Sequence, residues 1–127
     1  MTEKVVVTGM GTLNPVALDV AGFWKGLIEG KSGLGPVTRF DPSRLTSKIA
    51  GELKGFDPLD DMERKEARRA DPFTQYAMAA SREAMAQSGL DTSENNGNRI
   101  GVIIGSGVGG VQTWEAQHRT LLEKGPG

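Results

Sequence analysis

The sequence predicts an α/β fold, and two observations carry this prediction. Two apolar runs of strand length, residues 5–8 (VVVT) and 100–104 (IGVII), each lead directly into a glycine-containing loop. Amphipathic helical patterns follow both runs, and a longer helical pattern lies between them. Because both runs are apolar throughout, we expect both faces of the sheet to be covered by helices.

The first apolar run is predicted to be a buried strand that ends at Gly9 and leads through a loop to a helix. Asp19 suits the N-cap of that helix, and Gly30 stands where a helix-ending glycine is typical. Between them the apolar residues recur at helical spacing, so the helix is expected to pack on the sheet. These apolar positions are Val20, Phe23, Trp24, Leu27 and Ile28.

The middle of the chain is loop-rich from residue 33 to residue 58, with a turn at residues 39–42 and a short strand within residues 48–53. A densely charged stretch follows. Asp71 and Pro72 then supply an N-cap and a first-turn proline for a long helix that ends near Gly89. The buried stripe of this helix mixes large and small side chains, so another backbone segment can lie very close to it. Its members are Phe73, Tyr76, Ala77, Ala80 and Ala84.

The second apolar run, residues 100–104, is predicted to be a strand that enters a glycine loop and then a helix ending near Gly125. Gly105, Gly107 and Gly110 carry no Cβ, so the backbone can turn sharply there and a ligand or chain segment can approach closely. The spacing of these glycines matches the dinucleotide-binding fingerprint, but no second strand with a ribose-binding acid follows. A piece of a nucleotide-binding oxidoreductase therefore stays an alternative.

The composition narrows the possible functions. A chain of 127 residues with a net charge of −1 predicts one domain, residues 1–127 without an internal boundary, and no global attraction to nucleic acid or to a membrane surface. The absence of a signal peptide or membrane-spanning segment favours a cytoplasmic location.

The residue types present also limit the chemistry. With no cysteine and only His118, these residues offer no thiolate nucleophile, and we expect neither a metal site nor a cofactor. Two or three strands make a thin sheet, so more sheet is expected from outside these residues.

Basic residues cluster after residue 63. Arg64, Lys65, Arg68 and Arg69 fall within little more than one helical turn and would form a cationic edge. Acidic residues surround them, so a solvated face whose charges pair with one another is one interpretation. Binding of an acidic partner or of a phosphate is the functional alternative.

Four segments taken together, residues 5–16, 33–43, 64–90 and 99–118, closely resemble the N-terminal part of the type II β-ketoacyl-acyl carrier protein synthases. This resemblance implies a thiolase-like fold, an α-β-α-β-α sandwich of two similar halves in a homodimer, with this chain as part of the first half. It also implies elongation of fatty acids by decarboxylative Claisen condensation. The catalytic cysteine and two histidines of the family match no residue here, so the chain alone is expected to be inactive.

The resemblance also implies two binding regions. Lys65, Arg68 and Arg69 match the residues with which the family docks the acidic acyl carrier protein and its phosphopantetheine-linked acyl chain. Gly107 and Val108 match the loop beside the acyl channel, where valine in place of the usual isoleucine predicts a roomier pocket, an effect of about 1 kcal/mol or less. The glycine loop is thus expected to form one side of an apolar tunnel, and loop glycines facing solvent would count against this.

Three alternatives to a fatty-acid synthase remain open at this stage. A polyketide ketosynthase would share the fold, the chemistry and much of this segment. A carrier-protein docking module without catalysis would need only the basic cluster. The nucleotide-binding oxidoreductase piece is the third.

Overall fold

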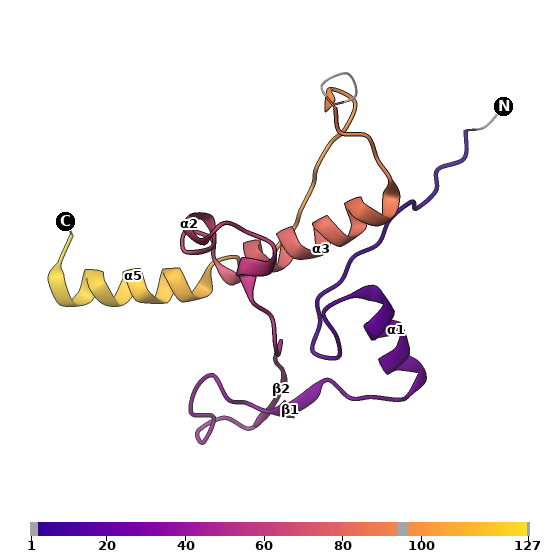
Figure 1. Cartoon of the computed structure of the whole chain (residues 1–127). Coiled ribbons are helices and arrows are strands. Elements are labelled where there is room, and N and C mark those ends of the chain that lie inside the picture. Colours follow the sequence, from indigo (N-terminus) through magenta and orange to yellow (C-terminus); the bar gives the residue numbers. More distant parts are fainter. Residues whose placement is uncertain (1–2, 94–96, 127) are drawn as a thin grey trace. The chain divides into compact units, whose positions relative to one another are not determined.

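A computed structural model of the chain describes residues 3–93 and 97–126 (Figure 1). The chain divides into two compact units, Met1–Asp57 with Ala79–Leu90 and Pro58–Met78 with Asp91–Gly127, and the division falls inside one helix, α3. In chain order the elements are α1 (Val20–Ile28), β1 (Leu34–Pro36), β2 (Ile49–Gly51), the 3-10 helix η1 (Pro58–Asp60), α2 (Arg64–Ala67), α3 (Pro72–Ser88) and α5 (Val111–Lys124).

The helix α1 confirms its predicted bounds. The Asp19 carboxylate accepts a hydrogen bond of 2.6 Å from the backbone N–H of Gly22, as an N-cap does. Gly30 has a φ of +66°, which glycine adopts without steric cost at a helix end. The expectation that α1 packs on a sheet is wrong for this structure, because its apolar stripe remains largely in solvent, with Trp24 64% and Ile28 71% exposed.

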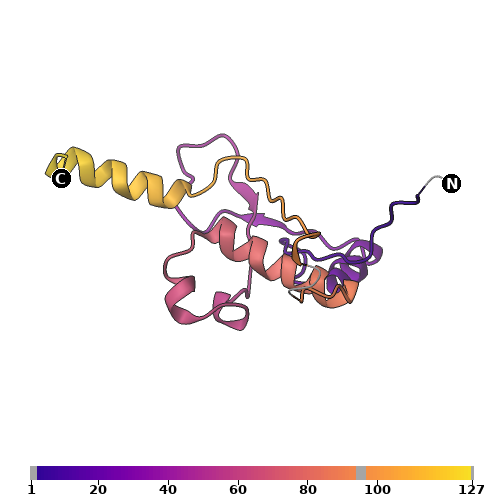
Figure 2. The ribbon, with the colours of Figure 1, turned by 90° about the horizontal axis from the view of Figure 1, so that it is seen from above.

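The sheet within the described residues is a pair of three-residue antiparallel strands, seen as the two short arrows in Figure 2. In its register Leu34 lies opposite Gly51 and Pro36 opposite Ile49. The short strand predicted within residues 48–53 is confirmed as β2, whereas its partner β1 was expected to be loop.

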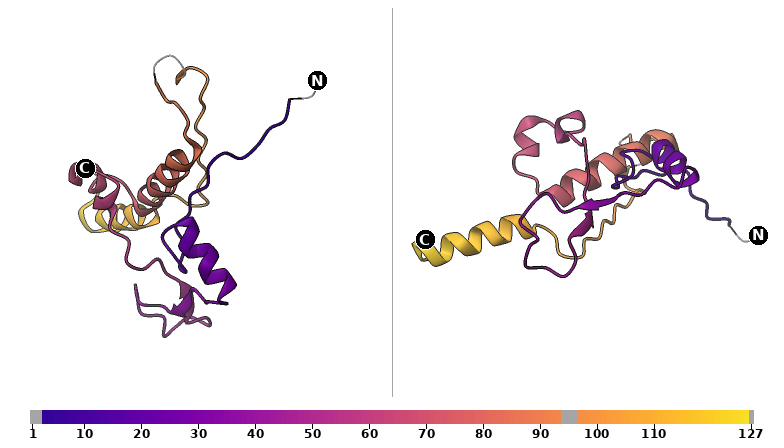
Figure 3. Two further views of the ribbon diagram at one scale, coloured as in Figure 1. Left: turned by 45° about the vertical axis from the view of Figure 1, so that its right-hand side comes forward. Right: turned by 90° about the horizontal axis from the view of Figure 1, so that it is seen from below.

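The second half of α3 packs against residues 9–12, which run alongside it (Figure 3). A Cβ on Gly9 or on Gly11 would collide with the backbone carbonyl oxygen of Ala84 or Ala80, respectively. The predicted close approach of another backbone to the small residues of this helix is therefore confirmed.

Carboxylate and amide side chains of α3 fasten the same region. Glu83 accepts hydrogen bonds from the backbone N–H groups of Thr12, at 2.9 Å, and Val20, at 2.8 Å. The Gln87 side-chain oxygen accepts one from the Met10 N–H at 2.6 Å. Residues 9–20 are thus tied to α3 through groups that the apolar pattern did not indicate.

The two apolar runs that predicted the sheet form no strand in this structure. Residues 5–8 and 100–104 carry no sheet hydrogen bonds, and Val5 and Ile103 are 98% and 99% exposed. A strand needs a neighbour to satisfy its backbone groups, and the described residues supply none for either run. Two buried strands were therefore a wrong prediction for these residues alone, and the expected contribution of sheet from elsewhere stays a prediction.

In the second unit, the first half of α3 and α5 form as the helical signals predicted, and the short helix α2 forms within the charged stretch, for which no helix bounds were predicted. The long helix begins at Pro72, and α5 ends at Lys124 with Gly125 as its C-cap, whose φ is +78°. Over the described part of the chain, none of the helices combines the length and apolar character needed to cross a bilayer.

Candidate functional site

The basic cluster lies on and just after α2. Lys65 belongs to this helix, Arg68 is its C-cap and Arg69 follows, and all three side chains are exposed. We call these three residues the basic turn. Its inward side is anchored by Ala67, which is buried.

A side chain from α3 fixes the end of the basic turn. The Gln75 amide nitrogen donates to the carbonyl oxygens of Ala67, at 2.9 Å, and Ala70, at 3.1 Å. Carbonyls at the end of a helix have no partner within it, so this amide satisfies groups that would otherwise need water. The backbone that presents the three cations is therefore fastened to α3.

The charges of the basic turn are not neutralised locally. In the part of the chain that the structure describes, Lys65, Arg68 and Arg69 pair with no carboxylate. The interpretation of this stretch as a face of mutually paired charges finds no support for these cations. Their ammonium and guanidinium groups remain free to attract an anionic partner.

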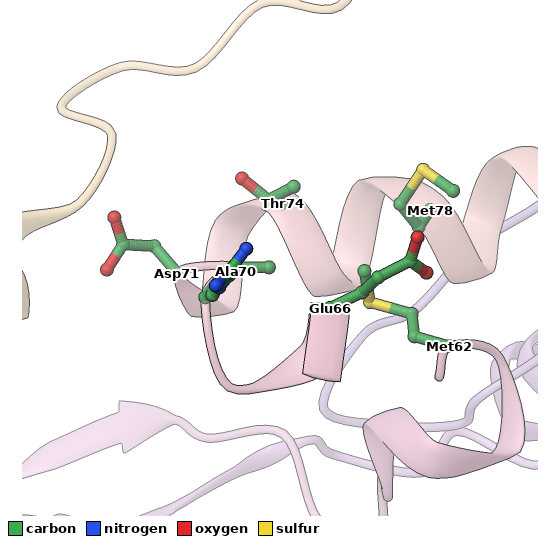
Figure 4. Close-up of a pocket in the computed structure, with 7 residues that line it drawn as sticks. Met62, Glu66, Ala70, Asp71, Thr74 and Met78 are labelled. Atoms are coloured by element: carbon green, nitrogen blue, oxygen red, sulfur yellow. The ribbon is translucent and has the colours of Figure 1, made fainter. Parts of the chain in front are cut away.

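A shallow cavity of about 470 Å³ borders the basic turn (Figure 4). Its walls combine charged and apolar side chains from the segment before α2, from α2, from the turn between α2 and α3, and from α3. In Figure 4, the Asp71 carboxylate points away from Met62, Glu66 and Met78. The lining residues are Met62, Glu66, Arg69, Ala70, Asp71, Thr74 and Met78.

The glycine loop lies open to solvent. A Cβ added to Gly105 or Gly107 would meet no atom within 4 Å, and the Val108 side chain is 82% exposed. The described residues therefore build no tunnel wall here, and the expectation of an enclosed apolar surface fails for this chain by itself. The positive φ of the loop, +72°, belongs to Gly109, which was not among the glycines singled out from the sequence.

Gly110 is the one glycine of the predicted set at which a close approach occurs. A Cβ on it would collide with the Asp71 carboxylate. That carboxylate also accepts a hydrogen bond from the Thr113 hydroxyl in the first turn of α5. The sequence suggested Asp71 only as an N-cap of α3, and no spacing rule connects it with a threonine 42 positions away.

His118 packs against an aromatic side chain of its own helix. Its imidazole stacks on the Trp114 indole one turn earlier in α5, with ring centroids 5.6 Å apart and planes inclined by 4°. Among the described residues, no three histidine, cysteine or acidic side chains gather as they would around a metal ion.

Comparison with known proteins places this arrangement in context. Residues 2–126 match the family described as Beta-ketoacyl synthase, N-terminal domain. The chain is 48% identical over 124 residues to 3-oxoacyl-[acyl-carrier-protein] synthase 2 of Staphylococcus aureus (strain COL), which covers 98% of this chain and 30% of that protein. The corresponding synthase of Synechocystis sp. (strain ATCC 27184 / PCC 6803 / Kazusa) is 44% identical over 124 residues, with the same coverage.

Solved ketosynthase structures are similar as well. The ishigamide ketosynthase/chain length factor matches with a TM-score of 0.75 and 26% identity over 94% of this chain and 30% of its own. A type II PKS acyl-carrier protein in complex with its ketosynthase bound to the hexaketide matches with a TM-score of 0.76 and 26% identity, over 98% and 33%. The chain thus spans about a third or less of the proteins it matches. With nearly every residue inside the family match, this chain belongs to the β-ketoacyl synthase N-terminal domain family.

Proposed function

We propose that this chain forms the N-terminal portion of a 3-oxoacyl-[acyl-carrier-protein] synthase that elongates fatty acids. The 48% identity to the S. aureus synthase 2 over 98% of the chain carries this proposal. The identity to the structure described as a type II PKS ketosynthase with its acyl-carrier protein is 26%, so the fatty-acid reaction is favoured over the polyketide one.

In this proposal the covalent chemistry belongs to residues outside this sequence. A cysteine thiolate attacks the acyl thioester, becomes acylated and releases the carrier thiol. Decarboxylation of malonyl-carrier protein then releases carbon dioxide and yields an enolate, which attacks the acyl carbonyl, expels the cysteine thiolate and leaves the 3-oxoacyl thioester on the carrier protein. Two histidines assist decarboxylation and stabilise the oxyanion. These 127 residues contain no cysteine and one histidine, which is stacked on Trp114, so their part is recognition.

The proposed partner is an acidic acyl carrier protein that docks on the basic turn. Three exposed cations without carboxylate partners, on a backbone fastened by Gln75, offer a rigid positive surface. One similar structure is a ketosynthase in complex with its acyl-carrier protein. Complementary charge mainly accelerates encounter and makes binding sensitive to salt.

Gly107 and Val108 are proposed to border the acyl chain in the assembled synthase. Their present exposure requires that the rest of the enzyme, in a homodimer, cover this loop. The same covering would bury the exposed side chains of residues 102–104, which a soluble enzyme does not normally leave in water as a contiguous run.

The reaction is tested with a chimera in which this chain replaces the matching 124 residues of the S. aureus synthase 2. Incubation with acyl- and malonyl-carrier protein is expected to give the 3-oxoacyl product by mass spectrometry, whereas the 127-residue chain alone gives none. A folded, dimeric chimera without product would overturn the assignment. Turnover by the chain alone would contradict the location of the chemistry outside these residues.

Carrier docking is tested by reversing the basic turn. The triple substitution Lys65→Glu, Arg68→Glu and Arg69→Glu is expected to weaken salt-sensitive binding of the carrier protein by about tenfold or more. A control with the same charge change elsewhere, Lys25→Glu, Lys31→Glu and Lys48→Glu, should bind nearly as the unchanged protein does. Equal losses in both variants would mean that net charge alone is recognised. Docking by the chain together with an inactive chimera would favour the non-catalytic docking module.

A further inference from the structure

We infer that Asp71 is a positioning residue that holds the start of α5, and with it the loop of Gly107 and Val108, against the segment that carries the basic turn. This inference rests on the proposed function, because it assigns Asp71 to the acyl-chain selectivity of the same enzyme. All of the contacts on which it depends lie within one compact unit of the chain.

The backbone of Asp71 is fixed where α3 begins. Its carbonyl oxygen accepts hydrogen bonds from the N–H groups of Thr74, at 2.9 Å, and Gln75, at 3.1 Å. Gln75 in turn binds the Ala67 and Ala70 carbonyls at the end of the basic turn. The residue is therefore anchored to the same hydrogen-bonded framework that presents the docking cations.

The side chain of Asp71 turns away from this framework to α5. Its carboxylate accepts the Thr113 hydroxyl and occupies the space in which any side chain at position 110 would lie. Gly110 is the N-cap of α5 and provides no side-chain cap of its own. A carboxylate near the N-terminus of a helix also interacts favourably with the helix dipole. Asp71 thus supplies from another element the negative group that α5 lacks locally.

The glycine loop is coupled to this contact through its own hydrogen bonds. The Ser106 hydroxyl accepts from the Gly109 N–H at 3.0 Å, and the Gly109 carbonyl accepts from the Val111 N–H at 3.0 Å. Residues 106–111 therefore form one locally bonded turn that ends at the helix held by Asp71. Displacement of Gly110 would carry Gly107 and Val108 with it, since two to three residues separate them.

The test removes the contact from either side in the chimeric synthase. Thr113→Val deletes the hydroxyl and keeps the β-branched shape, and Asp71→Ala deletes the carboxylate. Both are expected to shift the ratio of kcat/KM for long versus short acyl-carrier substrates by about fivefold, with an unchanged dissociation constant for the carrier protein. Thr113→Ser should restore the original ratio. Thr120→Val is the control, because Thr120 lies on the same helix and its hydroxyl donates to the Ala116 carbonyl within that helix.

Amide hydrogen exchange in the 127-residue chain provides a readout independent of activity. Exchange at residues 109–114 is expected to accelerate about tenfold in Thr113→Val and Asp71→Ala, but not in Thr120→Val. Unchanged exchange overturns the inference whatever the chimera does. Faster exchange with an unchanged acyl-length ratio in an active chimera overturns the selectivity role. If the unsubstituted chimera is inactive, the proposed function fails, and hydrogen exchange alone decides whether Asp71 holds the loop.

Discussion

Residues 5–11 and residues 100–110 have the same sequence pattern, an apolar run followed by closely spaced glycines, yet their glycines have different surroundings. Gly9 and Gly11 lie so close to α3 that no side chain fits at either position. Gly105 and Gly107 have open space around them. The pattern indicates that a backbone can be approached closely, but whether anything approaches it depends on a partner elsewhere.

The surroundings of the two glycine regions differ because, in the part of the chain that the structure describes, only Gly9 and Gly11 have a helix, α3, packed against them. The small side chains of Ala80 and Ala84 let another backbone lie against α3. Glu83 and Gln87 of the same helix accept hydrogen bonds from backbone N–H groups of the residues that lie there. For the second glycine loop the described residues provide one such contact, between Gly110 and Asp71. Within residues 3–93 and 97–126, the apolar runs themselves have no neighbouring strand in either region.

The largest expected effect comes from a charge in the second apolar run. Ile103→Asp should change the stability of the 127-residue chain by no more than about 0.5 kcal/mol, since the side chain is in water, and should reduce its aggregation. In the chimeric synthase, where the run is proposed to be buried, the same substitution should cost about 3 kcal/mol or more. Urea unfolding and light scattering measure the two effects. Gln117→Asp on α5 is the control, and equal small effects of Ile103→Asp in both proteins would refute the burial.

An intermediate effect is expected where the two glycine regions are compared directly. In the 127-residue chain, Gly11→Ala should destabilise the contact with α3 by about 1–3 kcal/mol, because the new Cβ meets the Ala80 carbonyl. Gly107→Ala should change stability by about 0.5 kcal/mol or less. Thermal unfolding checks both. In the chimera the cost of Gly107→Ala should rise, and a value still near zero there would place the loop in solvent in the whole enzyme too.

The smallest expected effect is a pH dependence of stability at the contact between Thr38, in the loop after β1, and Glu52, directly after β2; this contact belongs to neither glycine region. Hydrogen bonds from the Thr38 hydroxyl and then the Thr38 N–H hold the pKa of Glu52 below its ordinary value of 4.5. A lowered pKa in the folded state stabilises the fold above the unfolded pKa, and this contribution is lost as the pH falls through the folded value. The stability difference between the unchanged chain and Glu52→Gln should therefore shrink below about pH 4.5.

A carboxyl titration followed by NMR checks this cause. Thr38→Val should return the pKa of Glu52 toward 4.5. An identical Glu52 titration with and without the threonine hydroxyl would contradict it. The stabilities of the two glycine regions should not respond to Thr38→Val, which makes this loop an internal reference for the other two experiments.

The helices could be predicted from the sequence because their signals are local. Asp19, Gly30, Pro72 and Gly125 mark helix ends through bonds or backbone angles within a few residues, and the structure confirms the helices they bound. A strand depends on hydrogen bonds to a segment distant in sequence. The apolar pattern of residues 5–8 and 100–104 therefore predicted a preference for burial that these residues cannot fulfil among themselves.

In the candidate site too, features set by local spacing could be predicted, and contacts between residues distant in sequence could not. The basic turn follows from the spacing of Lys65, Arg68 and Arg69, and its assignment to carrier docking came from resemblance and stays a proposal. The contact between Asp71 and Thr113 joins two helix starts that are far apart in sequence, so no periodicity indicates it. The hydrogen bonds by which Gln75 holds the basic turn could not be predicted from the sequence either. A glutamine in an amphipathic helix indicates only that its position is polar.

The exposed side chains of residues 5–7 and 102–104 have a consequence for biosynthesis. In the synthase proposed here, strands outside this sequence would pair with these segments, and until a ribosome has made them, at about 5–20 residues per second, the segments would stay uncovered. During that interval the nascent polypeptide would expose two apolar segments whose backbone groups have no strand partner. In the proposed synthase, prompt covering of these edges by other segments would therefore limit aggregation during synthesis.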